Sequence, residues 1–136
     1  MATLRLPAVM ESLESFRSFV LQQMEREGGL EGLLSQVELA LEEVLVNAIS
    51  YAYPQGSGEI EVECRADGPG RFYLALKDCG VAFNPLEQAP PDLSKDISSR
   101  PIGGLGIYLA KQMAARLSYE HRDGCNVLML WFEKKG

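Results

Sequence analysis

The chain has 136 residues, of which 46% are hydrophobic and 24% are charged, and its 13 basic and 19 acidic residues give a net charge of −6. These values are typical of one globular domain and exclude extensive disorder. They also argue against a nucleic-acid-binding protein or a polybasic membrane-surface protein, because both classes need a basic patch and this chain is acidic.

The cysteines and the apolar runs indicate the compartment. Cys64, Cys79 and Cys125 have no metal-ligand spacing, and their odd number favours reduced thiols over a disulfide framework. No run approaches the roughly 18 apolar residues of a membrane span, and the N-terminus lacks a long apolar stretch. We therefore expect a cytoplasmic protein that consists of a single domain, residues 1–136.

The first half of the chain predicts one strand followed by two helices. The strand covers residues 3–6 and ends at Pro7, and the first helix covers about 8–27 with apolar residues at helical spacing. Ser35 is the expected N-cap of the second helix, over about 36–52.

The second half predicts a hairpin, a long loop, a helix and another hairpin. Strict alternation marks strands at 59–65 and 71–77, and a proline-rich loop follows over about 81–101. A third helix is expected from near Gly104 through Leu117, and then strands at 118–122 and 127–133. This order predicts an α+β two-layer sandwich, in which helices cover one face of a mixed, mostly antiparallel sheet.

Three segments carry candidate chemistry, and the first is on the second helix. Glu43 and Asn47 are four residues apart, so both side chains leave the same helix face about one turn from each other. An amide oxygen can bind Mg²⁺, and a carboxylate can act as a general base. The same spacing is also found on an ordinary solvated helix face.

The second candidate segment is Asp78-Cys79-Gly80, which lies where a strand gives way to a loop. A carboxylate in this place can accept a hydrogen bond from an exocyclic amine such as that of adenine, and Gly80 would let the backbone approach a flat ring. The alternative is a simple turn, since Asp and Gly are common turn residues.

The third candidate segment is Gly103-Gly104-Leu105-Gly106, directly before the third helix. Glycines at a helix start expose backbone N–H groups, and the helix dipole favours an anion there. The spacing matches neither a Walker A loop nor the Rossmann fingerprint. The alternative is a flexible loop that joins a helix.

In this order, the three segments resemble the Bergerat ATP-binding fold of gyrase and histidine kinases. The sequences Glu42-Glu43-Val44-Leu45-Val46-Asn47-Ala48, Phe83-Asn84-Pro85 and Gly103-Gly104-Leu105-Gly106-Ile107-Tyr108-Leu109 look like those of the bacterial anti-sigma factor serine/threonine kinases. The resemblance covers nearly the whole chain.

The resemblance implies ATP and Mg²⁺ as cofactors and a role for each matching residue. Asn47 would coordinate Mg²⁺, and Glu43 would be the general base for a protein serine or threonine. Asp78 would hold the adenine amine, and Gly80 would line the base. The other implied cofactor-binding residues are Asn84, Gly103, Gly104, Leu105 and Gly106. Residues 86–102 would form the ATP lid.

Three positions depart from the family pattern. Ala82 replaces the second glycine of an Asp-x-Gly-x-Gly motif, and Tyr51 stands where many family kinases have a histidine. Ile102 stands where some carry an arginine aimed at the terminal phosphate, and Lys95 or Arg100 of the lid are the candidate substitutes. These departures bear on the rate of phosphoryl transfer more than on ATP binding.

Two main functional hypotheses follow from the resemblance. The first is an ATP-dependent protein kinase that binds a sigma factor, or phosphorylates a STAS-domain anti-anti-sigma protein, or both, and that could form a homodimer. The second is a nucleotide-gated partner-binding module without significant kinase activity. A third alternative is a domain that has kept the fold and lost the ligand.

Overall fold

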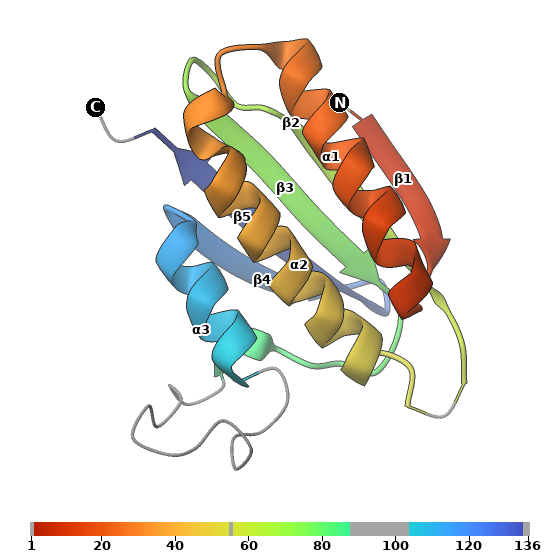
Figure 1. Cartoon of the computed structure of the whole chain (residues 1–136). Coiled ribbons are helices and arrows are strands. Elements are labelled where there is room, and N and C mark those ends of the chain that lie inside the picture. Colours follow the sequence, from red (N-terminus) through yellow and green to blue (C-terminus); the bar gives the residue numbers. More distant parts are fainter. Residues whose placement is uncertain (1, 55, 88–103, 135–136) are drawn as a thin grey trace.

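The sheet of the protein is built from strands in which polar and apolar residues alternate. The computed structural model describes residues 2–54, 56–87 and 104–134 (Figure 1). The strands are β1 (Ala2–Pro7), β2 (Glu59–Ala66), β3 (Arg71–Asp78), β4 (Arg116–Arg122) and β5 (Cys125–Glu133). They pair in the order β1-β2-β3-β5-β4, and each neighbouring pair is antiparallel. In the described residues the sheet is therefore antiparallel throughout, where a mixed, mostly antiparallel sheet was predicted.

Three α-helices cover one face of this sheet, as Figure 1 shows: α1 (Leu13–Glu27), α2 (Leu34–Tyr51) and α3 (Gly104–Met113). Short 3₁₀ turns are η1 (Met10–Ser12), η2 (Glu31–Leu33) and η3 (Pro85–Glu87). The core lies between the two layers, where Phe16 of α1, Phe72 of β3 and Phe132 of β5 are fully buried. The α+β two-layer sandwich is confirmed. No described helix is long and apolar enough to cross a membrane.

The first two helices begin at other residues than the sequence pattern predicted. Val9 has an extended backbone with φ −132° and ψ 155°, so α1 starts at Leu13 after a 3₁₀ turn and not near residue 8. The prediction that Ser35 caps the second helix is wrong, because α2 starts at Leu34 without a side-chain cap. Burial of Leu30 and Leu33 against the core places the start of α2 before Ser35.

The end of the third helix was also predicted too late. The helix stops at Met113, and Leu117 belongs to β4, where it pairs with Leu130. The backbone N–H of Ala115 donates to the Trp131 carbonyl at 2.7 Å. This segment therefore joins the sheet, although its apolar residues continue the spacing of the helix. The closing hairpin turns on Asp123 and Gly124 alone, both with positive φ, as in the tight turns that Asp-Gly favours.

The prediction of reduced thiols is wrong for two of the three cysteines. Cys79 and Cys125 form a disulfide across 46 residues of sequence, directly beyond the β3–β5 pair Asp78 and Asn126. Their separation along the chain hides this pairing, which arises because the end of β3 meets the start of β5. Cys64 is a buried free thiol in β2, and burial raises its pKa to about 12, which makes it a poor nucleophile.

Reduction of this disulfide is expected to lower the free energy of unfolding by at least about 2 kcal/mol, because an intact bridge restricts the unfolded chain. Urea unfolding with and without a dithiol reductant measures the difference. The Cys79→Ser/Cys125→Ser double variant is the control and should not respond to the reductant. Equal stability of the oxidised and reduced wild type would contradict the prediction.

Candidate functional site

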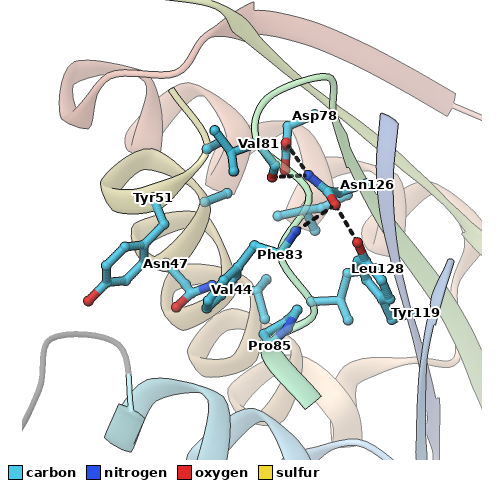
Figure 2. A pocket seen from close by; sticks show the side chains of 13 residues that line it. Val44, Asn47, Tyr51, Asp78, Val81, Phe83, Pro85, Tyr119, Asn126 and Leu128 are labelled. Atoms are coloured by element: carbon cyan, nitrogen blue, oxygen red, sulfur yellow. Dashed lines mark hydrogen bonds between the residues drawn. The ribbon is translucent and has the colours of Figure 1, made fainter. Parts of the chain in front are cut away.

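A cavity lies between the C-terminal half of α2 and the sheet, at the end where β3 stops and β5 starts (Figure 2). Three parts of the chain that are far apart in sequence form its wall, namely α2, the end of β3 with the segment after it, and the β4–β5 hairpin. The lining residues are Val44, Asn47, Ala48, Tyr51, Ala52, Leu76, Asp78, Val81, Phe83, Pro85, Tyr119, Asn126 and Leu128.

Asn47 is a polar residue that α2 contributes to this cavity. Its side chain is buried at 5% exposure among the apolar residues of the helix. Oδ1 of Asn47 has no hydrogen-bond partner among the described residues. Leaving a buried acceptor unpaired costs about 1–3 kcal/mol, so such an atom calls for an explanation beyond folding.

Asp78 is the last residue of β3 and lines the same cavity. Its Oδ1 accepts two hydrogen bonds, from the backbone N–H of Gly80 at 3.1 Å and from Nδ2 of Asn126 at 2.9 Å. Within the described part of the chain, Oδ2 accepts none. The carboxylate is thus fixed through one oxygen and keeps the other available for a donor.

Two aromatic rings form another part of the wall. Tyr51 of α2 and Phe83 stack with ring centroids 5.6 Å apart and an interplanar angle of 25°. Tyr51, at the position where the resemblance implies a histidine, lines the cavity. Aromatic and apolar walls with a few fixed polar groups are typical of small-molecule and cofactor sites.

Gly80 has a structural role that the sequence did not reveal. A Cβ on this residue would lie 1.9 Å from the carbonyl oxygen of Ala52, at the end of α2. The following residue, Val81, donates its N–H to that same oxygen at 2.8 Å. Gly80 therefore allows the segment after β3 to dock on α2, and its predicted contact with a base stays a prediction.

We expect Gly80→Ala to destabilise the protein by about 2 kcal/mol, because backbone atoms at the end of α2 would have to move away from the added methyl group. The change should appear as a lower midpoint in urea unfolding. Gly56→Ala is a matched control, since nothing lies within 4 Å of a Cβ built there. A Gly80→Ala variant as stable as Gly56→Ala would contradict the steric argument.

Glu43 lies one turn before Asn47 on α2 and is half-buried. Burial, with a smaller contribution from the neighbouring charge of Glu42, raises the pKa of Glu43 above its ordinary value. A raised pKa makes a carboxylate a better proton acceptor. Glu43 is not among the residues that line the cavity.

The other predicted site residues are Asn84 and the segment Gly103 to Gly106, which precedes and begins α3. Oδ1 of Asn84 accepts the N–H of Leu86 at 2.9 Å and so supports η3, while Asn84 does not line the cavity. Gly104, Leu105 and Gly106 form the first turn of α3, where a helix start was predicted. Gly103 and most of the predicted lid, with Lys95, Arg100 and Ile102, lie outside the described residues.

Asn126 was not among the predicted site residues, and it lies just before the strand predicted at 127–133. The turn consists of Asp123 and Gly124 only. Asn126 therefore lies inside β5 and is buried on the same face as Leu128 and Leu130. Its amide contacts Asp78, the loop after β3 and Tyr119 (Figure 2). A polar residue in phase with the core-facing positions of a strand was the signal that could have found it.

These observations fit an adenine nucleotide with a hard cation. An unpaired amide oxygen suits Mg²⁺, which prefers oxygen ligands, and Asn47 supplies one without adding charge. A free carboxylate oxygen on Asp78 suits an amine donor on a base, and the Tyr51 and Phe83 rings suit its flat face. The start of α3 provides backbone N–H groups of the kind that bind phosphate.

Comparison with known proteins agrees with this geometry. The family model of the histidine kinase-like ATPase domain matches residues 6–132. The serine-protein kinase RsbW of Bacillus thuringiensis (strain Al Hakam) is 28% identical over 130 residues, which cover 93% of this chain and 81% of that protein. RsbW of Bacillus mycoides (strain KBAB4) is 26% identical over the same shares of the two chains.

Solved structures support the same fold. The structure of the RsbU and RsbW domains of Rv1364c from Mycobacterium tuberculosis aligns over 98% of this chain with a TM-score of 0.62 and 14% identity. The match covers 32% of that chain, so this protein spans about a third of its length. The mycobacterial sensor histidine kinase MprB aligns over 94% of this chain and 97% of its own, with a TM-score of 0.55 and 20% identity.

Proposed function

Because the chain belongs to the histidine kinase-like ATPase domain family, we propose that it is an ATP-binding anti-sigma-factor-type regulator that phosphorylates a serine or threonine of a STAS-domain antagonist protein. The similarity to proteins named serine-protein kinase RsbW supports this choice within the family. In this proposal the protein works in the cytoplasm, and its partners are a sigma factor, the STAS-domain protein, or both. A homodimer is compatible with the proposal.

One observation carries the proposal, namely that Asn47 keeps a buried, unpaired oxygen in the same cavity as Asp78. A cation bound to this oxygen would offset the free-energy cost of burying it without a hydrogen bond. Asn47 would hold Mg²⁺, Asp78 would accept the adenine amine, and the segment Gly103 to Gly106 would donate N–H groups to the phosphates. Mg²⁺ held there would supply neutralisation of the phosphate charge during transfer.

Glu43 performs the proton transfer in this mechanism. It accepts the proton of the partner's hydroxyl while that oxygen forms a bond to the γ-phosphorus and the bond to the β–γ bridging oxygen breaks. The products are a phosphoserine or phosphothreonine and ADP. Phosphoryl transfer relies mostly on positioning and electrostatics, so one base and a few fixed donors are sufficient.

A specific observation favours a second function, the nucleotide-gated binding module. Glu43 does not line the described cavity, and Ala82 and Ile102 depart from the kinase pattern. In that case ATP would control the contact with a sigma factor or another regulator without transfer of the phosphoryl group.

One experiment separates these functions. The protein is incubated with γ-labelled ATP, Mg²⁺ and the STAS-domain protein encoded nearest to its gene, and ATP binding is measured in parallel by calorimetry. Label on a serine or threonine of the STAS protein supports the kinase, and omission of Mg²⁺ should abolish it. ATP binding without label transfer would leave the binding module, and no ATP binding would exclude both.

A further inference from the structure

We infer that Asn126 is the positioning residue that sets the adenine specificity of the site, an inference that rests on the proposed ATP binding. Asn126 is 6% exposed and lies in β5 directly opposite Asp78 of β3. It would act through Asp78 and not through contact with the reacting phosphate.

The amide of Asn126 uses its full hydrogen-bonding capacity. Nδ2 donates to Oδ1 of Asp78 at 2.9 Å and to the carbonyl oxygen of Val81 at 2.8 Å. Oδ1 accepts the backbone N–H of Phe83 at 3.2 Å and the hydroxyl of Tyr119. A neutral amide has two donor hydrogens and two acceptor lone pairs, so each is engaged inside the protein and none is left for a ligand.

This network fixes the orientation of the Asp78 carboxylate. With Gly80 N–H as its second donor, Oδ1 of Asp78 is saturated, and Oδ2 is the oxygen left for the ligand. The Cys79–Cys125 disulfide closes the same strand end one residue further out. Two hydrogen-bond donors, from Gly80 and Asn126, therefore hold the carboxylate of Asp78, and the disulfide at Cys79 fixes the adjacent backbone.

The network also links the carboxylate to the aromatic wall. Asn126 holds both ends of the segment from Val81 to Phe83, and the Phe83 ring stacks on Tyr51. A single side chain therefore sets the position of the acceptor and of the ring wall together. The two features that would recognise a base are coupled through Asn126.

A carboxylate oxygen that can only accept selects for a donor on the ligand. Adenine presents an exocyclic amine at the position where guanine presents a carbonyl oxygen. The carbonyl would face the Asp78 oxygen without a proton between them, and unpaired buried polar groups of this kind cause strong discrimination. The wild-type site should therefore bind ATP at least about 100-fold more tightly than GTP.

Asn126→Asp tests the inference, because it keeps the size of the side chain and replaces its two donor hydrogens by a second carboxylate. ATP affinity should fall at least about 30-fold while GTP affinity changes less than about 3-fold, so that the ATP-to-GTP preference collapses. Asn126→Ser, which can still donate one hydrogen, should keep part of the preference. Calorimetry in the presence of Mg²⁺ measures the affinity for ATP and for GTP of the wild type and of each variant.

A matched control and the melting curves separate positioning from folding. Gln22→Glu adds the same charge at an exposed site on α1 and should keep the wild-type preference. If Asn126→Asp and Asn126→Ser melt cooperatively but lose ATP and GTP affinity in equal proportion, the residue is merely structural and the inference fails. Unchanged ATP affinity in Asn126→Asp would also overturn it. A wild-type protein that binds neither nucleotide would overturn the proposed function, and this inference with it.

Discussion

Replacement of Asn47 by leucine is expected to abolish Mg²⁺-dependent ATP binding and to stabilise the free protein. Leucine has a similar shape but offers no oxygen, and loss of even an outer-shell metal partner typically costs about 10–100-fold in affinity. We therefore expect ATP affinity in the presence of Mg²⁺ to fall at least about 100-fold. The free protein loses an unpaired buried acceptor, which removes a penalty of about 1–3 kcal/mol.

The opposite signs of the two effects make this prediction specific. A residue that serves the fold loses stability when it is replaced, whereas a residue kept for a ligand loses binding and gains stability. Calorimetric ATP titration and urea unfolding measure the two quantities on the same samples. Ser50→Ala, at an exposed site on the same helix, should change neither. A less stable Asn47→Leu protein that still binds ATP with wild-type affinity would refute the role of Asn47.

Replacement of Glu43 by glutamine is expected to lower phosphoryl transfer by about 10²–10⁴-fold, the usual contribution of a general base. ATP affinity should stay within about 3-fold of wild type, because glutamine keeps the size of the side chain and Glu43 is outside the cavity lining. Single-turnover label transfer to the STAS-domain protein measures the rate. Transfer at the wild-type rate would show that another group accepts the proton.

The pH dependence of transfer provides a further test of Glu43. A base works only when deprotonated, so the rate should fall as the pH is lowered through the pKa of Glu43. Burial and the charge of Glu42 raise that pKa, so the loss should begin at a higher pH than for an ordinary glutamate. Glu42→Gln removes the second cause and should shift the acidic limb to lower pH with the maximal rate unchanged. An acidic limb that persists in Glu43→Gln would assign it to another group.

Local patterns predicted the order of the elements well, because strand alternation and helical spacing are properties of neighbouring residues. The hairpin of β2 and β3 was predicted within one residue at each end. The start of α3 at Gly104 was also predicted, since glycines before an apolar stripe indicate a helix start. The errors fall at boundaries where distant contacts compete with local preference, as at Ser35 and Leu117.

The candidate site could be predicted where one residue type carries a recognisable chemistry. Asn47 and Asp78 were predicted because an amide and a carboxylate in these contexts suit a cation and a base. The structure brings both into one cavity, and their roles stay predictions. Asn126 was missed because its partners are 43 to 48 residues away in sequence for all but Tyr119. Its chemistry exists only after β5 has paired with β3.

The sequence by itself determined which elements form, that Glu43 and Asn47 lie one turn apart on α2, and which family the segments resemble. These features depend on spacing within one element, which the chain specifies directly. Only the tertiary structure decided that Cys79 bonds to Cys125, that Gly80 docks on Ala52, and that Asn126 fixes Asp78. Each of these depends on the antiparallel register of β3 and β5 or on the packing of α2 against the sheet, and that register is set by contacts between residues far apart in the chain.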